Sequence, residues 1–582
     1  MSNVWEFQNF NQQENLVKMV EDLDISTSLA KLLIDRGITD FEAAKSFFRP
    51  ELSGLYDPFL MKNMNEAVNR IQDAIANGEK ILIYGDYDVD GTTAVALMYQ
   101  YLTNFTQDLT YYIPDRYKEG YGVSNIGVDF AIDNDITLII ALDCGTKAVE
   151  KIQRAKDNGV DFIICDHHTP GETLPNAILL NPKQKGCTYP FKELCGCGVG
   201  FKLAQAINDT MGLPFSEVEY LLDLVMVASG ADIVSMMGEN RVMCHYGLKK
   251  LNEHPRIGFK ELLKLAKKEG VLTVTDVVFT LAPRINAAGR IKTGNKAVEL
   301  LLTDTLEAAQ KIGKEINEYN TERRALDKDI TEQALSQIKD DEWLLNAKST
   351  VVFNKDWHKG VVGIVASRLI ETYYKPTIVL TESNGQAVGS ARSVKNFNVY
   401  DAIDKCSDLL TQFGGHFYAA GLTMPVENVP AFKLKFNAVV SDSITKEQLQ
   451  AKIEITDNLD FRDIFEAERN VIPKFYRVLK QFAPFGPDNM HPIFVTKGVQ
   501  LVGDARLLKD EHIKCTLKQD EYPDIQIEAI GFNMGHYFPL IKTPSSSNVP
   551  KIFDVAYSIE ENNWRGKSTL QLMIKDIKVS DD

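Results

Sequence analysis

This 582-residue sequence lacks several features that would place it in a specialised class of protein. No apolar run approaches the roughly 18 residues that a membrane-spanning helix needs. The opening residues 1–6 lack the basic start and apolar core of a signal peptide, and no internal repeat or low-complexity tract is evident. The sequence therefore favours a large globular protein of the cytoplasm, and its length predicts roughly three or four domains.

Cysteine is scarce, with eight residues in the chain and no CxxC pair among them. Cys195 and Cys197, with Cys187 nearby, offer three thiolates, but no fourth ligand stands at the spacing of a structural zinc site. Reduced thiols in a cytoplasmic protein are the simpler interpretation.

Positive charge is also in deficit, since 64 Lys and Arg face 80 Asp and Glu and give a net charge of −16. A chain this acidic is not expected to coat duplex DNA non-specifically, although it can hold a strand in a locally basic channel. Surface exposure would explain any single basic residue. Several basic residues are nevertheless concentrated in glycine-rich motifs, and this concentration favours contact with phosphate. They are Arg284, Arg290, Lys292, Lys355, His358, Lys359 and Arg368.

Three short apolar runs each end in side chains that bind metals. Residues 80–84, 137–142 and 160–165 are followed by GDYDVDG (85–91), DCG (143–145) and DHH (166–168). Nearly continuous apolar runs separated by helical stretches indicate buried parallel strands. Ligands bind beyond the carboxyl ends of such strands, so we expect five aspartates and two histidines to converge on one edge of a parallel sheet.

Each of these pieces has a plainer interpretation when it is taken alone. Asp143 could be a turn residue or a helix cap, the two histidines could fill a core or surface, and residues 86–90 could form a calcium loop. The glycine and glutamate of an EF-hand are missing at their offsets, and a strand precedes the loop. The three strand ends together favour a metal site, because so many carboxylates repel each other unless cations lie among them.

The type of ligand limits the choice of metal. Hard carboxylates with few histidines favour Mn²⁺ or Mg²⁺ over zinc. More oxygen ligands are present than one ion needs, so we expect two divalent ions, about 3.5–4 Å apart. No serine or cysteine nucleophile motif is evident, so metal activation and positioning would have to lower most of the reaction barrier.

These motifs, in this order, resemble the DHH phosphoesterase superfamily, which is named for the triplet at residues 166–168. Further segments resemble the RecJ family of single-strand-specific DNA exonucleases: APRINAAGR (282–290), WHKGVVGIVASR (357–368), FAPFG (482–486) and NWRG (563–566) with QL (571–572). GSARS (389–393) and GGH (414–416) resemble the companion DHHA1 domain. The string ASGAD (228–232) departs from the family's usual Gly-Thr-x-Ala-Asp but keeps its aspartate.

The resemblance implies an α/β protein in which a parallel-sheet DHH catalytic domain is joined by a long helix to a smaller α/β DHHA1 domain, followed by a β-barrel OB-fold for single strands. We expect an N-terminal helical segment of the catalytic lobe at 1–70 and the DHH catalytic domain at 71–303. The connecting long helix is expected at 304–340, the DHHA1 domain at 341–445 and the OB-fold at 446–582.

The local patterns agree with this arrangement. Residues 38–44 indicate a helix cap and start. Apolar residues from Ala309 to Ala334 follow three-four-seven spacing, and the densely charged outer face favours a bridging helix over a plain core helix. Alternating patterns predict barrel strands at 452–455, 513–517, 553–557 and 569–574, with a loop at 544–548.

The resemblance also assigns roles to single residues. One ion would be held by Asp86, Asp88 and Asp143, and the other by Asp90, Asp143, His167 and Asp232, so that Asp143 bridges both. His168 would touch the substrate phosphate, which makes all seven residues candidates for the catalytic set. Contacts to the strand are expected from Arg116, Arg284, Asn286, Arg290, His358, Arg368, Ser390, Arg392, Gly415 and His416.

Within this last group Arg392 is the candidate clamp for a 5′ phosphate, aided by Ser390 and the amides of the glycine-rich segments. A structural ion pair is the alternative role for Arg392.

The implied function is a metal-dependent 5′-to-3′ exonuclease that hydrolyses single-stranded DNA to 5′-mononucleotides in DNA repair and recombination. Two alternatives remain. One is a DHH phosphodiesterase for short oligonucleotides or cyclic dinucleotides, which the C-terminal module disfavours. The other is a non-catalytic single-strand-binding relative, which the complete acidic set disfavours. The expected partner is single-stranded DNA with a 5′ end, and no membrane association is expected. A helicase and a single-strand-binding protein are further candidate partners. The protein itself is expected to be a monomer.

Overall fold

The computed structural model describes residues 3–8, 10, 13–465, 472–542, 551–564 and 567–579. The chain divides into two compact units. The large unit is Leu52–Gln450, and the small unit combines Met1–Glu51 with Ala451–Asp582. Within the described ranges, no helix has the length and hydrophobicity to span a bilayer.

The first sheet of the large unit confirms the expected parallel strands. Its five strands are all parallel and lie in the order β3 (Leu109–Tyr112), β2 (Ile81–Gly85), β4 (Leu138–Leu142), β5 (Asp161–Cys165) and β6 (Ile178–Leu180). Every residue of β2 and β4 is buried, as continuous apolar strands are when helices cover both faces. Because β2, β4 and β5 are neighbours, Asp86, Asp143 and Asp166 emerge next to each other at one edge.

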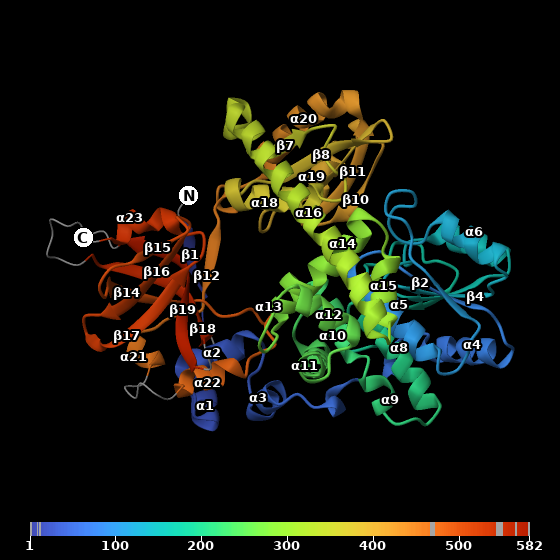
Figure 1. The fold of residues 1–582 in the computed structure, drawn as a ribbon, viewed down its shortest axis with the longest axis horizontal. Helices are drawn as coiled ribbons and strands as arrows, with labels where there is room; N and C mark the ends of the chain where they lie inside the picture. Colours follow the sequence, from blue (N-terminus) through green and yellow to red (C-terminus); the bar gives the residue numbers. More distant parts are fainter. Residues whose placement is uncertain are drawn as a thin grey trace. The chain divides into compact units, whose positions relative to one another are not determined.

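Helices cover both faces of this sheet (Figure 1). On one face lie α4 (Met64–Ala76), α5 (Val89–Leu102) and α8 (Gly196–Thr210), and on the other lie α6 (Asn125–Asp133) and α7 (Val149–Asp157). Alternate residues of β2 serve the two cores, because Ile81 and Ile83 face the first set of helices and Leu82 and Tyr84 the second. Helix α10 (Leu222–Ala231) packs on α5 and α8 and ends at Asp232.

The expected long helix is α16 (Leu306–Asp340), whose 35 residues span about 52 Å at 1.5 Å per residue. Ala309 and Ile316 near its start belong to the core of the first sheet. Ile330 and Ala334 lie in a separate core with α18 (Val362–Tyr373). The helix therefore connects two lobes of the large unit (Figure 1).

The second lobe is the expected smaller α/β domain. Its sheet has the order β10 (Gln412–His416), β11 (Ala419–Pro425), β9 (Gln386–Arg392), β8 (Thr377–Ser383) and β7 (Thr350–Phe353). Only β7 and β8 are parallel, and the other neighbours are antiparallel. Helices α18, α19 (Val399–Asp404) and α20 (Val429–Ser443) complete this lobe.

The small unit contains the expected barrel. Its five strands are β14 (Phe494–Leu501), β18 (Phe553–Trp564), β19 (Lys567–Val579), β17 (Tyr522–Gly531) and β16 (His512–Gln519), and pairing of β14 with β16 closes the ring. The predicted strands 513–517, 553–557 and 569–574 lie in β16, β18 and β19. The predicted loop at 544–548, and Arg565 and Gly566 of the tail motif, lie outside the described residues.

One predicted barrel strand lies elsewhere. Residues 452–455 form β12 (Lys452–Ile455), which pairs in parallel with β1 (Val4–Phe7) in a separate two-stranded sheet. The alternating pattern identified a strand correctly, but the partner is about 450 positions away in the chain (Lys452 lies opposite Val4), and no local pattern specifies it.

The N-terminal segment also divides differently from the expected 1–70, because residues 1–51 belong to the small unit. Long-range contacts hold them there. The Trp5 indole donates to Asp576, and Lys31 pairs with Asp457 at 3.1 Å. Arg36 donates to Asn489 and to the Met490 carbonyl, while Phe482 packs against Phe47 and Phe48.

Candidate metal centre

The turn after β2 presents three aspartates within five residues. Asp86 follows the strand, Asp88 caps helix α5 by accepting from the Gly91 amide, and Asp90 lies in the first turn of α5. A Cβ at Gly91 would lie 2.4 Å from the Asp86 carbonyl oxygen, so only glycine permits so sharp a change from strand to helix. The local motif thus fixes the spacing of these carboxylates.

A second helix holds Asp90 in place. The amides of Gly196 and Cys197, at the start of α8, donate to its two carboxylate oxygens at 2.6 and 2.7 Å. A helix N-terminus stabilises an anion through such free amides and the helix dipole. The CGC string at 195–197, considered above as a zinc site, therefore orients a carboxylate instead.

The same turn also determines where Asp143 can lie. A Cβ on Gly196 would come within 2.5 Å of the Asp143 Cβ and 2.7 Å of its Cα. Asp143 itself has a φ of 59°, which is uncommon for a residue other than glycine. Gly196 thus allows Asp143 and Asp90 to approach the same point, a role that the sequence did not reveal.

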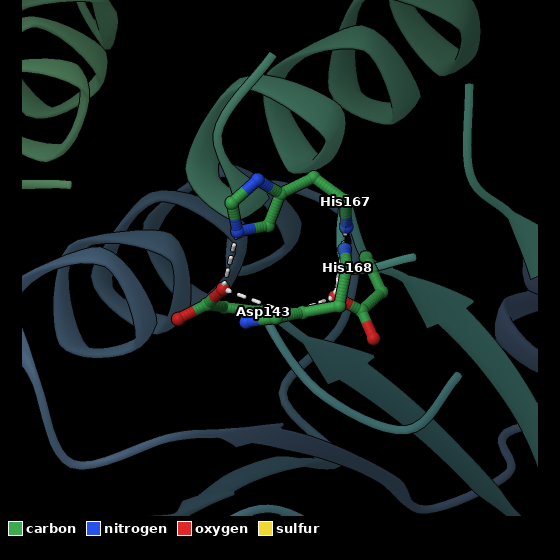
Figure 2. A group of neighbouring side chains, drawn as sticks. Asp143, His167 and His168 are labelled. Carbon is green, nitrogen blue, oxygen red and sulfur yellow. Dashed lines mark hydrogen bonds and ion pairs between the residues drawn. The ribbon is translucent and has the colours of Figure 1, made fainter. Parts of the chain in front are cut away.

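His167 points at the carboxylates. Its Nε2 lies 3.3 Å from Asp143 Oδ1, 3.6 Å from Asp232 Oδ2 and 3.9 Å from Asp90 Oδ2. Figure 2 shows Asp143 linked to both imidazole rings, since His168 Nδ1 also lies 3.9 Å from Asp143 Oδ1. The structure thus brings residues from four separate segments to one cluster.

Asp166 lies in this group but its oxygens are already engaged. Oδ1 accepts from the amides of His167 and His168 and lies 2.7 Å from His168 Nδ1, and Oδ2 accepts from the Thr146 amide. Asp166 therefore fixes the orientation of His168, and the Nε2 of that ring faces away from Asp166. The Tyr121 hydroxyl lies 2.9 Å from this Nε2.

The electrostatics of the cluster favour a bound cation. Burial and the neighbouring carboxylate of Asp88 raise the pKa of Asp90 to about 6, and burial with Asp90 and Asp88 raises the pKa of Asp232 to about 9. The pKa values of Asp86 and Asp143 rise well above their usual range for the same reasons. Burial, together with His168, lowers the pKa of His167 to about 3, so this ring is neutral at pH 7 and keeps a lone pair for a metal.

Asp166 differs from the other aspartates. Burial alone would raise its pKa, but hydrogen bonds from His168 and Thr146 outweigh burial and hold the pKa of Asp166 below its usual range. The pKa of His168 is raised despite burial, because of its hydrogen bond to Asp166. Asp166 and His168 are therefore hydrogen-bonded to each other, whereas Asp86 and Asp143 beside them each keep a buried oxygen that makes no hydrogen bond.

Unpartnered buried atoms support the same conclusion. Among the described residues, Asp86 Oδ2, Asp143 Oδ1 and His167 Nε2 are buried and make no hydrogen bond. Buried polar atoms normally have a partner. Two groups have the geometry to hold an ion: Asp90, His167 and Asp232, and Asp143 with Asp166, His167 and His168. Oxygen ligands with one or two imidazoles suit Mn²⁺ or Mg²⁺.

Residues of the second lobe reach this edge. The His416 ring stacks on His168 with centroids 6.2 Å apart and an angle of 18° between the planes. Gly415 precedes it with a φ of 154°, and a Cβ there would lie 2.4 Å from the Ala419 carbonyl oxygen. The glycine-rich strand β10 therefore brings His416 to the metal edge.

Three arginines gather near the junction of the two lobes. Burial lowers the pKa of Arg290 to about 10, with further contributions from Arg116 and Arg392. Burial and Arg116 also lower the pKa of Arg392. Within the part of the chain that the structure describes, none of the three forms an ion pair with a carboxylate. Arg392 Nη1 donates to Ser390 Oγ and the Ala391 carbonyl, and Arg290 donates to the Gly360 carbonyl. We refer to Arg116, Arg290 and Arg392 as the arginine cluster.

Other predicted strand contacts have structural partners. Arg368 donates through Nε and Nη2 to the buried Asp327, at 2.8 and 2.7 Å, so an ion pair uses this guanidinium. Arg284 donates to the Thr280 carbonyl and to Asn317, and Asn286 lies half-buried on α14 (Ala282–Ile291). The His358 ring packs edge-on against Tyr117, whose hydroxyl donates to the Arg290 carbonyl.

Comparison with known proteins gives consistent matches along the chain. The DHH family N-terminal domain matches residues 80–229, the DHHA1 domain matches 346–442 and the RecJ OB domain matches 466–576. The sequence is 36% identical, over 99% of its length, to the single-stranded-DNA-specific exonuclease RecJ of Bacillus subtilis, of which it covers 71%. It is 29% identical to RecJ of Salmonella typhimurium, with 95% of this chain and 96% of that protein covered.

Solved structures agree with the sequence matches. The crystal structure of RecJ from Thermus thermophilus in complex with Mn²⁺ matches all of this chain and 80% of its own, with a TM-score of 0.82 and 26% identity. The complex of the same protein with Mg²⁺ gives a TM-score of 0.76 at 25% identity, covering 100% of this chain and 79% of that chain.

Proposed function

Because this chain belongs to the RecJ family of single-stranded-DNA-specific exonucleases, we propose that it hydrolyses single-stranded DNA from the 5′ end to 5′-mononucleotides. The activity is metal-dependent, and its cofactors are divalent ions, Mn²⁺ or Mg²⁺. The observation that carries this proposal is the convergence of buried, unpartnered carboxylate and imidazole atoms at the ends of β2, β4 and β5, with Asp232 at the end of α10 beside them.

The ligand set divides between two ions. We assign Asp86, Asp88 and Asp143 to one ion, and Asp90, His167 and Asp232, again with Asp143, to the other. When bound, the ions activate water as a nucleophile and neutralise charge that develops on the phosphate oxygens. The Gly196 and Cys197 amides keep Asp90 in position for this set, and Gly196 leaves room for Asp143.

The protein groups next to the ions orient the scissile phosphate. Asp166 fixes His168 through Nδ1, so a phosphate oxygen would contact His168 through Nε2, in place of the Tyr121 hydroxyl that lies 2.9 Å from it. His416 stacks on the same ring from the second lobe and adds a second imidazole donor at the site. These two rings would bind and position the phosphate without acting as metal ligands.

Polarity follows from the arginine cluster. Desolvated guanidiniums without a carboxylate partner are a prepared site for an anion, and a terminal phosphate carries more charge than an internal one. Arg392, held by Ser390, is the clamp that we assign to the 5′ phosphate, with Arg116 and Arg290 beside it. A strand bound there by its 5′ end would present its first internal phosphate to the metal edge.

The alternatives fit less well. A phosphodiesterase for short oligonucleotides or cyclic dinucleotides has no evident use for the barrel matched by the RecJ OB domain. A non-catalytic relative would not need to keep the complete acidic set, and all seven candidate catalytic residues are present here.

The setting of the activity follows from the same premise. We propose that the enzyme acts as a monomer in the cytoplasm, in repair and recombination. A helicase that supplies single strands and a single-strand-binding protein are its candidate partners.

End-labelled single strands test the proposal. With Mn²⁺, a 5′ label should appear in mononucleotides at the earliest times, whereas a 3′ label should stay in shortening strands. EDTA should abolish both the release of the 5′ label and the shortening of the 3′-labelled strands. Early release of the 3′ label as mononucleotide would contradict the polarity, and unchanged digestion in EDTA would contradict the metal dependence.

A further inference from the structure

A buried ion pair anchors the first turn of helix α11 (Gly238–Glu253) to α8. Glu239 in α11 and Lys202 in α8 are both buried, and Lys202 Nζ donates to the Glu239 carboxylate at 2.8 Å. The same carboxylate accepts from the Tyr56 amide at 3.0 Å and from the Tyr189 hydroxyl. Because separating the partners of a buried ion pair costs much free energy, the start of α11 has a fixed position relative to α8.

Asn240, the next residue of this anchored turn, connects two other segments. It is fully buried, and its Nδ2 donates to the Glu193 carbonyl at 2.6 Å and to the Ser235 carbonyl at 2.9 Å. Glu193 lies just before Cys195, the residue that caps α8. Ser235 lies in the loop that follows Asp232 at the end of α10. One side-chain amide therefore joins the entrance of α8 to the exit of α10.

Each of the two joined segments holds a carboxylate of the metal centre. The entrance of α8 supplies the Gly196 and Cys197 amides that donate to Asp90. The exit of α10 carries Asp232 itself. His167 Nε2 lies 3.9 Å from Asp90 Oδ2 and 3.6 Å from Asp232 Oδ2. A movement of either segment would therefore change the separation of the two carboxylates.

The loop between α10 and α11 needs such a contact because its backbone is strained at both ends. Ile233 and Gly238 have φ angles of 58° and 53°, in the left-handed region. This region is unfavourable for a β-branched residue such as Ile233, and it persists only where the surroundings enforce it. At the other end, a Cβ on Gly238 would lie 2.7 Å from the Phe191 ring. The bond from Asn240 to the Ser235 carbonyl holds the loop between these two points.

We propose that Asn240 is a positioning residue for the ion assigned to Asp90, His167 and Asp232, which we call the second ion. By joining the segments that hold Asp90 and Asp232, its amide sets the separation of these two ligands. The inference rests on the proposed two-ion site. Groups that orient metal ligands without touching the metal typically change its affinity by about 10- to 100-fold. Neither the assigned ligands nor the expected strand contacts include Asn240.

Asn208 provides a closely matched control. It is also fully buried, and its Nδ2 donates to the carbonyls of Leu213 and Pro214 at 2.9 and 3.2 Å. In the described part of the chain, Asn208 and Asn240 each have a buried Oδ1 that makes no hydrogen bond. Asn208 lies in the last turn of α8, roughly 18 Å from Gly196 at 1.5 Å per residue. Its removal should therefore have the same local cost without disturbing the metal centre.

Calorimetric titration with Mn²⁺ compares wild type, Asn240→Ala and Asn208→Ala. Both variants should lower Tm in EDTA by similar amounts, because each leaves two carbonyls without a donor. Only Asn240→Ala should weaken the second ion, by about 10- to 100-fold, while the ion of Asp86, Asp88 and Asp143 keeps its wild-type affinity. Equal affinities in the two variants, or equal weakening of both ions in Asn240→Ala, would overturn the positioning role. Asn240→Asp keeps the side-chain size without the amide donor and serves the same purpose if Asn240→Ala does not fold.

Hydrogen exchange of the wild type tests the link without any substitution. The amides of 193–197 and 233–237 should become protected together, at the Mn²⁺ concentration that fills the second ion site. The amides of 208–214, at the far end of α8, should not change. Protection of one of the first two segments without the other would contradict a connection through Asn240.

Turnover as a function of Mn²⁺ separates positioning from ligation. For Asn240→Ala the half-saturating Mn²⁺ concentration should rise by the same factor as the dissociation constant, and kcat should return to near the wild-type value at saturating Mn²⁺, because every ligand is present. Asp232→Ala should not recover at any Mn²⁺ concentration. A kcat of Asn240→Ala that stays low at saturating Mn²⁺ would show that Asn240 does more than position ligands. If the wild type binds two ions and degrades single strands but Asn240→Ala matches Asn208→Ala, this inference fails while the proposed function stands. A wild type that binds no Mn²⁺ would instead overturn the proposed function.

Discussion

The metal edge and the arginine cluster are opposite versions of the same physical situation. At the edge, buried carboxylates repel each other and their pKa values rise. In the cluster, half-buried guanidiniums repel each other and the pKa values of Arg290 and Arg392 fall. Burying unpaired charge costs free energy that only a bound partner of opposite charge recovers.

The difference between them lies in the partner that each requires. The carboxylates need small cations that accept several oxygen ligands, and the guanidiniums need an anion with several oxygens. The proposed substrate end would supply the anion, and the bound divalent ions would supply the cations. Tyr87 and Tyr121 lie between the two regions.

The largest effect should come from removing the shared metal ligand. Asp143→Ala should lower turnover by at least about a thousandfold, the scale of strong electrostatic contributions to catalysis, while the fold is retained. The Mn²⁺-dependent rise in Tm should also disappear, because ligand binding to the native state is lost. Asp129→Ala, which removes a surface carboxylate paired with Arg154, is the control. Near-normal activity of Asp143→Ala would contradict the two-ion assignment.

A second change tests how the edge is built without touching a ligand. Gly196→Ala should force Asp143 and the α8 N-terminus apart and weaken Mn²⁺ affinity by about 10- to 100-fold, the range seen for residues that orient ligands. Gly198→Ala is the matched control, since a Cβ there has only ordinary contacts at 3.5 Å or more. Calorimetric titration with Mn²⁺ measures the affinity of each variant for the ion. Equal affinities for the two variants would mean that Gly196 does not position the ligands.

The third change removes a member of the arginine cluster. Arg392→Ala should lower the preference for 5′-phosphorylated over 5′-hydroxyl strands by about 10- to 100-fold, because a charge-assisted hydrogen bond to phosphate is lost. Mn²⁺ affinity should not change, which separates the two regions. Arg324→Ala removes the same charge from the exposed face of α16 and should leave the preference intact. The clamp assignment fails if rates on both kinds of strand fall equally.

The smallest effect on chemistry should follow removal of the small unit. Because residues 1–51 fold with 451–582, the informative truncation is Leu52–Gln450 rather than a deletion of the C-terminal part alone. It should bind long single strands at least about tenfold more weakly, since each stacked base contributes roughly 1–3 kcal/mol, and should cleave at a similar rate at saturating substrate. Fluorescence anisotropy with long and short strands measures this. Unchanged affinity for long strands would contradict a binding role for the barrel.

Much of the site could be predicted because its signals are local. The strand ends at Asp86, Asp143 and the DHH triplet combine an apolar run with the polar residues directly after it, and parallel pairing brings such ends together. The long helix and the barrel strands follow from periodicities of 3.6 and 2. The family resemblance then ordered these pieces into domains, and the barrel and the parallel sheet are confirmed.

What could not be predicted depends on which distant partner a residue meets. Arg368 lies in a motif that suggested strand contact, and no local pattern indicates that it also pairs with Asp327 on α16. Residues 452–455 are a strand as predicted, yet they pair with residues near the N-terminus. The contact of Tyr121 with His168 gave no signal either, because a tyrosine between two glycines looks like any exposed loop.

The amino-acid sequence by itself determined the catalytic chemistry, since the carboxylates and histidines stand directly after apolar strands, and a strand end needs no long-range information to be recognised. Only the tertiary structure decided how those groups are oriented and separated. Amides of α8, more than 100 residues along the chain, orient Asp90, Gly196 admits Asp143, and the junction of two lobes assembles the arginine cluster. Such contacts arise from packing, in which the chosen partner depends on the whole fold rather than on neighbouring residues.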